Sequence, residues 1–215
     1  MNLAVLGATG ATGRLLCDQA LAAGHTVAAV VRRPEAVGNR RLQLVKADVL
    51  DPQALEGAIL GRDAVVWAVG GHDRLRAAVR GEHRASDLNS RGTRNVLHAM
   101  TTEGVDRLIV ISSWGVGDSA PRLPFLFRRI VVPLLLRDEF ADKARQEDVV
   151  RASALRWTVV RPTRLTDGPR TDRVRAGHPL PFTTRSHIAR ADVAAFVLRT
   201  LEQDTHVHET VEITN

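Results

Sequence analysis

Three glycines near the start of the chain have the spacing of a phosphate-binding turn. Gly7, Gly10 and Gly13 follow an apolar run, residues 3–6, and precede an apolar helical pattern over residues 14–23. Such glycines permit a tight turn, a close approach of backbone to phosphate and close packing of helix on strand. Free N–H groups at the helix start then attract the phosphate, although a glycine-rich turn without a ligand is the alternative. The residues predicted to hold a dinucleotide pyrophosphate are Gly7, Thr9, Gly10, Ala11, Thr12 and Gly13.

Two arginines follow the second apolar run, residues 26–31. Sites that select NAD usually place an acidic residue here, about twenty residues after the turn, to bind the ribose hydroxyls. This chain instead has Arg32 and Arg33, whose guanidinium groups match a 2′-phosphate in geometry and charge. We therefore expect NADPH to be preferred over NADH. Solvated arginines at a strand end are the alternative.

Further candidate cofactor contacts come at the ends of later apolar runs. Asp48 could accept a hydrogen bond from the adenine amino group while Val49 covers the ring, although Asp48 could equally cap a turn or a helix. Val69, Gly70 and Gly71 would let the backbone pass close to ribose and phosphate, or they form a flexible turn.

Ser113 and Lys143 are the candidate catalytic residues. Ser113 leaves the carboxyl end of a predicted central strand, and the ammonium group of Lys143 could meet the nicotinamide ribose. Alternatively, Ser112 and Ser113 only form hydrogen bonds within their loop. Lys143 would then be a solvated helix residue, paired with Glu139 or Glu147 at four-residue spacing.

Four other side chains could border the same site. Trp114 could form an aromatic wall for a planar ligand, or it fills the core. His187 could reach the site, or it is a cap or a surface group. Asn89 and Thr93 lie one helical turn apart, so one of them could face the sheet edge and steady a loop.

Apolar runs and helical patterns alternate along the chain. The predicted strands are residues 3–6, 26–31, 42–47, 64–69, 107–111, 157–160 and 209–213, and the predicted helices are residues 14–23, 52–60, 86–102, 138–153 and 190–202. Strands of near-continuous Val, Leu, Ile and Ala imply a parallel sheet covered on both faces. The predicted fold class is α/β, a doubly wound parallel sheet of the Rossmann type in a single domain, residues 1–215. Substrate loops are expected within residues 70–85, 113–137 and 163–189.

The composition and charge of the chain limit the kinds of partner that we expect it to bind. The net charge is +6, but the arginines are dispersed and the chain has only eight Phe and Trp residues and no Tyr, so no nucleic acid is expected. The longest apolar run, residues 130–136, contains Pro133 and is too short to span a bilayer, so no membrane partner is expected. No signal-peptide pattern opens the chain, and the single Cys17 is interpreted as a core residue in a reducing, cytoplasmic setting.

Two further patterns resemble a metal site and the nucleophile of a hydrolase, but neither is complete in this sequence. His206 and His208 would share one face of a strand, but they have no third ligand nearby, so no metal site is predicted. The sequence also has no Gly-x-Ser-x-Gly motif to present a nucleophilic serine, which leaves hydrolysis without support.

The whole arrangement resembles the atypical short-chain dehydrogenases, and within them the NmrA-like group that includes biliverdin reductase B, a flavin reductase. The motifs that carry the likeness are the glycine turn, Ser112-Ser113, Asp142-Lys143 with Glu147, and a strand ending in Arg161-Pro162. The likeness spans nearly the full chain. The cofactor contacts that it implies are Gly7, Thr9, Gly10, Thr12, Arg32, Asp48, Val49, Val69, Gly70, Ser112, Pro162 and Thr163.

The sequence departs from most short-chain dehydrogenases at the proton donor. Those enzymes use a Tyr four residues before the Lys, whereas position 139 is Glu and the chain contains no tyrosine. A phenolic acid is therefore absent, which argues against an ordinary ketone reductase and against a sugar epimerase. Flavins, quinones and linear tetrapyrroles spread the charge of the reduced ring and can collect a proton from water. The enzymes like biliverdin reductase B also lack this tyrosine.

We therefore expect an NADPH-dependent oxidoreductase that transfers hydride to a small planar conjugated acceptor. One alternative is a non-catalytic, NmrA-like redox sensor that binds NADP and signals its presence to a protein partner. A third possibility is an NAD(P)-dependent epimerase or dehydratase of a sugar nucleotide, for which 215 residues leave little room.

Overall fold

An eight-stranded sheet forms the centre of the computed structural model, which describes residues 1–39, 41–70, 87–183 and 185–215. Its strands are β1 (Asn2–Leu6), β2 (Thr26–Val31), β3 (Gln43–Lys46), β4 (Ala64–Trp67), β5 (Arg107–Ile111), β6 (Arg156–Pro162), β8 (Arg175–Gly177) and β10 (Glu209–Thr214). The strand order is β3-β2-β1-β4-β5-β6-β10-β8. All neighbours pair in parallel except β8, which is antiparallel to β10. The doubly wound fold is confirmed, with one antiparallel edge strand as a correction.

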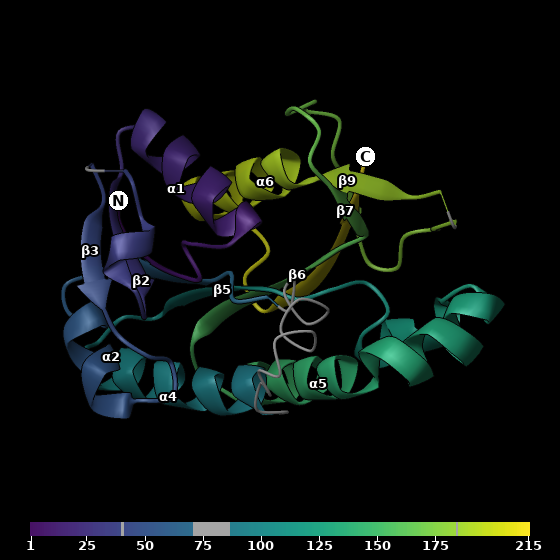
Figure 1. Ribbon diagram of the computed structural model, residues 1–215, viewed down its shortest axis with the longest axis horizontal. Helices are drawn as coiled ribbons and strands as arrows, with labels where there is room; N and C mark the ends of the chain where they lie inside the picture. Colours follow the sequence, from purple (N-terminus) through teal and green to yellow (C-terminus); the bar gives the residue numbers. More distant parts are fainter. Residues whose placement is uncertain (40, 71–86, 184) are drawn as a thin grey trace.

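Helices cover both faces of this sheet (Figure 1). The regular helices are α1 (Ala11–Ala22), α2 (Pro52–Ile59), α4 (Leu88–Thr102), α5 (Arg137–Arg151) and α6 (Arg190–Glu202). The helices α1 and α6 pack together on one face, and α2, α4 and α5 lie on the other. Within β1, Leu3 and Val5 join the core under α1 and α6, while Ala4 and Leu6 join the core on the opposite face. Burial on both faces explains why the strands are almost entirely apolar.

Side chains outside the sheet fix where two of the helices begin. The carboxylate of Asp51 accepts hydrogen bonds from the N–H groups of Gln53 and Ala54, at 3.1 and 3.3 Å, and Pro52 follows it in the first turn of α2. The start of α4 is capped from another element. Asp142 in α5 accepts the N–H groups of Asn89 and Ser90, at 2.7 and 3.2 Å, and so ties α5 to α4.

Two predicted loops contain more structure than expected. Residues 113–137 hold a short helix, η2 (Gly117–Arg122), and a π-helix, η3 (Phe127–Leu136), that leads into α5. Residues 163–189 contain β8 and a separate parallel pair, β7 (Arg164–Thr166) with β9 (His187–Ala189). The apolar run 130–136 has no amphipathic period to indicate a helix, and the short strands depend on partners distant in sequence. In the third predicted loop, residues 71–85 lie outside the described residues. A short helix, η1 (Pro34–Ala36), follows β2.

Among the described residues, no helix is both long enough and apolar enough to cross a bilayer.

Candidate functional site

The strand order places the candidate site between β1 and β4, where the chain stops adding strands on one side of the sheet and begins to add them on the other. From β1 the chain continues to β2 and β3 on one side, and from β4 to β5 and β6 on the other. In such sheets a crevice for a dinucleotide forms at the carboxyl ends of the two central strands. The glycine turn follows β1, Val69 and Gly70 follow β4, and Ser112 follows β5. The predicted cofactor segments therefore meet along one edge of the sheet.

The glycine turn packs against the end of β4 with no room for a side chain. Gly7 has a φ of +87°, and a Cβ atom there would lie 2.7 Å from the backbone of Ala68 and Val69. A Cβ atom on Gly13 would lie 2.2 Å from the carbonyl oxygen of Gly7. Gly10 provides no side-chain cap for α1, so the first N–H groups of the helix are left for another acceptor. This backbone cradle fits the diphosphate of a nicotinamide dinucleotide.

Sequence reasoning gave no role to Arg14, which stabilises the turn. Its Nε atom donates to the carbonyl oxygen of Thr9 at 2.9 Å, while the residue itself remains exposed. An exposed cation is thereby fixed beside the phosphate cradle, together with Ala11 and Thr12 in the first turn of α1. The only signal available in the sequence was its position directly after the glycine motif.

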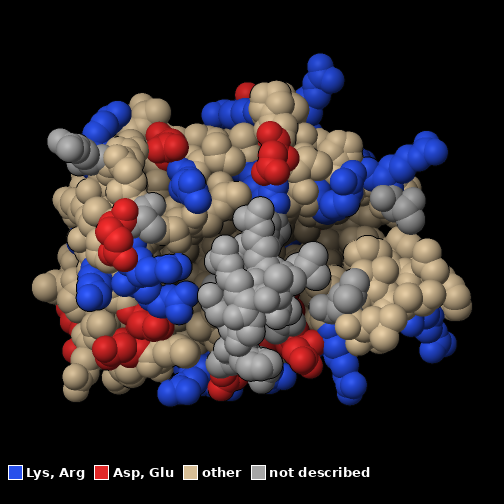
Figure 2. All heavy atoms as spheres, in the orientation of Figure 1, with Lys and Arg blue, Asp and Glu red and all other residues tan. Residues whose placement is uncertain are grey.

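Arg32 and Arg33 follow β2 and are both exposed. Within the described part of the chain, neither forms an ion pair with a carboxylate. Figure 2 shows Lys and Arg side chains gathered at the left of this face of the molecule, where β2 and β3 end in Figure 1. A free guanidinium group at this strand end is available to a phosphate.

Asp48 and Val49 form a tight turn after β3. The Asp48 carboxylate accepts the N–H group of Leu50 at 2.9 Å, which is the turn-capping role weighed as an alternative. The side chains of Val49 and Trp67 pack closely against α4 at Gly92. A Cβ atom on Gly92 would lie only 3.0 Å from Val49 and 2.7 Å from Trp67. The turn is therefore held rigidly beside the crevice.

Ser112 begins a buried network of polar groups. Its hydroxyl donates to Oε1 of Glu147 at 2.5 Å. Arg161, at the end of β6, donates to the same carboxylate through Nε at 3.1 Å and Nη2 at 2.6 Å, and neither side chain of this pair is exposed to solvent. Arg151 adds a third partner at 2.7 Å. The Ser112 hydroxyl thus donates to Glu147 and its backbone N–H donates to the carbonyl oxygen of Val160 at 2.8 Å, so both hydrogen-bond donors of this residue already have partners.

The network continues from Arg161 into the loops beyond the sheet. Nη1 of Arg161 lies 2.7 Å from Asp118 in η2, and Nε2 of His178 lies 3.1 Å from the other oxygen of Asp118. Nδ1 of His178 lies 3.4 Å from Glu212 of β10, which also binds Arg122. Burial lowers the pKa of Arg161, but the bonds to Glu147 and Asp118 outweigh burial and raise it above its ordinary value. Two of the predicted substrate loops are thereby anchored to the sheet by charge.

Lys143 is buried beneath the end of β5. Its Nζ atom lies 3.4 Å from the carbonyl oxygen of Ile111, the last residue of that strand. Burial lowers the pKa of Lys143, although the carboxylates of Glu139, Glu147 and Asp142 act in the opposite direction. The interpretation as a solvated helix residue is therefore wrong. The amine instead faces the strand end that carries Ser112.

Trp114 forms an aromatic pair between two loops. Its backbone N–H group donates to the carbonyl oxygen of Pro162 at 3.0 Å, and its indole ring meets the Phe182 ring edge-on, with centroids 4.8 Å apart. The indole Nε1 is buried and has no hydrogen-bond partner in the described parts of the chain. The hydroxyl of Ser113, directly before it, donates to the Trp114 carbonyl oxygen at 3.3 Å. Phe182 was missed because no pattern marks it within residues 163–189.

Several other candidates have structural partners instead. Asn89 binds Asp142, and Thr93 accepts a hydrogen bond from Gln146 at 2.7 Å. Both side chains therefore bind residues of α5, and the expectation that one of them steadies a loop at the sheet edge stays a prediction. The hydroxyl of Thr163 donates to that of Thr214 at 3.0 Å.

The histidines singled out in the sequence also have local partners. His187 is exposed, and its Nδ1 lies 2.9 Å from the carbonyl oxygen of Arg185. His206 pairs with Glu209 at 2.7 Å, and His208 lies 3.0 Å from the carbonyl oxygen of Leu155. In residues 1–39, 41–70, 87–183 and 185–215, no three His, Cys, Asp or Glu side chains gather closely enough to hold a metal ion. Gly71 lies outside the described residues.

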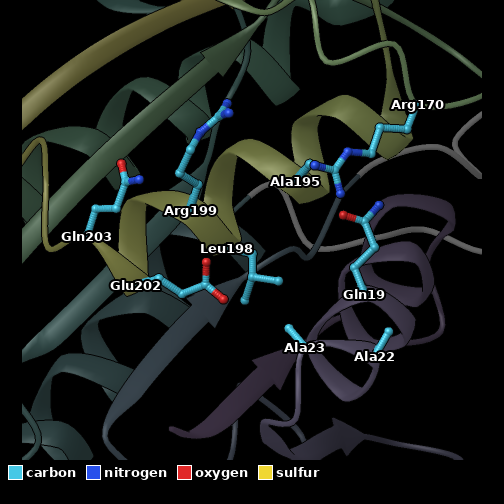
Figure 3. Close-up of a pocket in the computed structure, with 9 residues that line it drawn as sticks. All are labelled: Gln19, Ala22, Ala23, Arg170, Ala195, Leu198, Arg199, Glu202 and Gln203. Carbon is cyan, nitrogen blue, oxygen red and sulfur yellow. The ribbon is translucent and has the colours of Figure 1, made fainter.

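A hollow of about 370 Å³ lies elsewhere, between α1 and α6 (Figure 3). Gln19 and Arg170 reach toward each other across it, and Leu198 lines its wall. Two of its charged groups already have ionic partners, since Arg170 pairs with Asp172 at 2.6 Å and Glu202 lies 2.9 Å from His25, and a third, Arg199, lies 6.0 Å above the ring of Phe196. We assign no ligand to this hollow.

Comparison with known proteins agrees with this geometry. Residues 7–204 match the NAD(P)H-binding family, so the chain belongs to that family. An uncharacterized protein of Mycobacterium tuberculosis is 35% identical over 113 residues, which is 53% of this chain but only 12% of that much longer relative.

Two solved structures share the fold over nearly the whole chain. The oxidoreductase ylbE of Lactococcus lactis has a TM-score of 0.82 at 18% identity, covering 100% of this chain and 91% of its own. The anaerobillin reductase of Escherichia coli O157:H7 has a TM-score of 0.79 at 21% identity, covering 99% of this chain and 96% of its own. Family and fold confirm the predicted nicotinamide-dinucleotide domain of the Rossmann type.

Proposed function

We propose that this protein is an NADPH-dependent reductase that transfers hydride to a planar conjugated acceptor, such as a flavin, a quinone or a linear tetrapyrrole. The observation that carries the proposal is the Trp114–Phe182 pair at the carboxyl end of β5, with ring centroids 4.8 Å apart. Aromatic faces and edges orient a flat conjugated ligand, and the buried indole N–H offers it a hydrogen bond. A neighbour of the same fold is named as an anaerobillin reductase.

The cofactor would lie across the carboxyl ends of β1 and β4. The Gly7–Gly13 cradle would hold the diphosphate, while Arg32 and Arg33 would bind the 2′-phosphate of NADPH. When bound, NADPH supplies a hydride, which is two electrons and one proton, and leaves as NADP⁺. Asp48, Val49, Val69, Gly70, Gly71, Pro162 and Thr163 complete the proposed cofactor contacts.

Hydride transfer to a conjugated acceptor requires little from the protein except that it orients the cofactor and the acceptor. The acceptor takes the hydride into its conjugated ring, and its second hydrogen arrives as a proton from water. No tyrosine exists to donate that proton, and Glu139 occupies the position where related enzymes carry one. Lys143 and Ser113 would position the nicotinamide side of the cofactor at the end of β5. Orientation of the two reactants therefore supplies most of the rate enhancement.

Turnover with several acceptors tests this function. Purified protein is mixed with NADPH and with FMN, menadione or biliverdin, and the loss of nicotinamide absorbance is followed. A Phe182→Ala variant should raise the KM for the acceptor about tenfold and leave the Kd for NADPH unchanged. No turnover with any acceptor, combined with tight NADP binding, would overturn the reductase and favour a redox sensor that signals to a protein partner.

A further inference from the structure

Large apolar side chains are exposed together on the segment that leads into α5. The chain exposes eight large hydrophobic side chains among its described residues, and five of them lie between residues 125 and 134. These five, named here the η3 patch, are Phe125 (71% exposed), Leu126 (64%), Phe127 (41%), Ile130 (48%) and Leu134 (75%). Scattered exposed hydrophobic residues are normal, but such a cluster marks a surface that binds something.

The η3 patch takes no part in holding the fold together. None of its side chains belongs to either of the two hydrophobic cores of the sheet. Figure 1 shows this helical segment at the right end of the molecule, extending beyond α5 and away from the sheet. In Figure 2 the same end is a mostly uncharged lobe with Lys or Arg side chains along its lower edge.

The charges within the segment that carries the patch all have one sign, and the nearest acidic residues in the sequence lie at its two ends, Asp118 before it and Asp138 at the start of α5. Residues 119–137 contain four arginines and no Asp or Glu. Arg122 pairs with Glu212, whereas Arg128, Arg129 and Arg137 are exposed and have no carboxylate partner in the described residues. The guanidinium group of Arg129 lies 6.0 Å above the ring of Phe125. Cationic and apolar groups thus share one surface.

We propose that the η3 patch docks this protein on the surface of an anionic phospholipid bilayer. An interfacial helix inserts Phe and Leu side chains at the boundary between headgroups and acyl chains, while arginines meet the lipid phosphates. The predicted absence of a membrane partner rested on the lack of a spanning segment, and a segment that lies in the membrane plane needs no such length.

A second copy of this chain fits the patch poorly. In a two-fold dimer the same surface of each subunit would meet, which brings Arg128 and Arg129 close to their own counterparts. Like charges facing each other disfavour that contact, whereas anionic headgroups neutralise them. The docking surface is independent of the acceptor that the enzyme reduces, so the proposed function could fail without affecting it.

Sedimentation with lipid vesicles tests the proposal on the full chain. Wild-type protein is mixed with vesicles of phosphatidylcholine alone, or of phosphatidylcholine with phosphatidylglycerol, and the bound fraction is measured. Each arginine near an anionic surface strengthens binding by roughly fivefold, so Arg128→Gln with Arg129→Gln should weaken binding roughly 25-fold. Phe125→Ser with Leu134→Ser should reduce binding to the vesicles that contain phosphatidylglycerol.

Two double variants serve as matched controls. Arg91→Gln with Arg94→Gln removes the same charge from exposed positions on α4, and Leu44→Ser with Leu60→Ser removes exposed leucines elsewhere. Both controls should bind vesicles like wild type, and all variants should keep the wild-type melting temperature because the altered side chains are exposed.

Binding that requires phosphatidylglycerol and is lost only in the η3 variants supports the proposal. Equal binding to neutral vesicles, or no binding of wild type to anionic vesicles, overturns it. A dimer in analytical ultracentrifugation that Phe125→Ser with Leu134→Ser dissociates, without vesicle binding, would show instead that the patch is an interface between copies.

Discussion

The Glu147 carboxylate and the Arg161 guanidinium face each other in the fully buried space between α5 and β6, joined by hydrogen bonds of 3.1 and 2.6 Å. Because Glu147 also accepts from the Ser112 hydroxyl, this one carboxylate connects α5 with the ends of β5 and β6. The edge of the sheet at which we place the nicotinamide thus rests on a buried ion pair.

Removing the charge of Glu147 should destabilise the protein strongly. Glu147→Gln leaves the buried Arg161 cation with only the exposed carboxylate of Asp118, at 2.7 Å, as a counter-ion, so we expect the free energy of unfolding to fall by about 3 kcal/mol. Asp148→Asn is the matched control, because Asp148 is exposed and also pairs with Arg151, at 3.4 Å. That variant should change stability by less than about 1 kcal/mol. Urea unfolding measures both, and similar losses for the two would contradict the role given to Glu147.

Alanine substitutions at Gly7 and Gly24 distinguish the stability cost of a steric collision from that of backbone strain. Their φ angles are nearly equal, +87° and +85°, but a Cβ atom on Gly24 would meet nothing within 4 Å. Gly24→Ala should therefore cost only the strain of a left-handed residue, about 1–2 kcal/mol. Gly7→Ala adds the collision with the end of β4 and should cost about 1–3 kcal/mol more. It should also abolish NADPH binding in calorimetry, and NADPH affinity like that of Gly24→Ala would show that the cradle does not hold the cofactor.

Cys17 should be unreactive while the protein is folded. Burial, with a smaller effect of Asp18, raises the pKa of its thiol to about 12. At pH 8 only about one thiol in ten thousand would be ionised, and the thiolate is the reactive form. Ellman's reagent should therefore label Cys17 only after denaturant is added. Rapid labelling of the native protein would mean that α1 opens readily.

Asp192 should make stability fall in acid. Its buried carboxylate accepts hydrogen bonds from Thr171, Asp172 and Asn215, between 2.8 and 3.0 Å. Burial alone would raise the pKa of Asp192, but these bonds outweigh it and hold the pKa below its ordinary value. The stabilisation is thus complete above the unfolded-state pKa, about 3.9, and is lost as the pH falls through the lower folded-state value.

Comparison with a neutral variant isolates that effect. Asp192→Asn should lower the free energy of unfolding at pH 7 by roughly 2 kcal/mol and flatten the fall of the melting temperature between pH 4 and pH 2, a range set by the ordinary aspartate pKa of about 3.9. Asp106→Asn is the control, because this exposed residue lies 4.0 Å from its nearest cation, on Arg156. A wild-type acid profile in Asp192→Asn would contradict the assignment.

Arg32 and Arg33 should determine the choice of cofactor. Replacing both by Ala removes the cations offered to the 2′-phosphate, so the Kd for NADPH should rise about 10- to 100-fold while the Kd for NADH changes little. Isothermal calorimetry with both nucleotides measures this. Equal losses for both nucleotides would indicate a general effect on the fold, and unchanged binding of NADPH would leave these arginines as solvated surface residues.

The parts of the site that sequence alone predicted are those set by local geometry. Gly7, Gly10 and Gly13 act within one turn, and the position of Arg32 follows by counting along the chain from that turn. Glu147 could not be assigned in this way, because its partners Ser112 and Arg161 lie 35 and 14 residues away in the sequence. Charge pairing across a sheet depends on the register of distant strands, which spacing does not reveal.

The elements of the fold likewise divide into those that local sequence patterns predicted and those that depend on contacts distant in sequence. Continuous apolar strands and the helices between them were predicted, since burial on both faces leaves a clear pattern. The π-helix η3 was assigned to a loop, because residues 130–136 form an uninterrupted apolar run that contains Pro133 and shows no alternation of polar and apolar residues. Phe182 and its contact with Trp114 likewise depend on how two long connections meet in space.

The position of β10 affects how this chain can fold during its synthesis. This last strand lies between β6 and β8, so β6 has β5 as its only neighbour until residues 209–214 have left the ribosome. Until then Glu212 is missing, and the side chains of Arg122 and His178 lack their shared partner. A nascent chain held before residue 209 should therefore keep this half of the sheet open to chaperones and proteases, however early the nucleotide-binding half has closed.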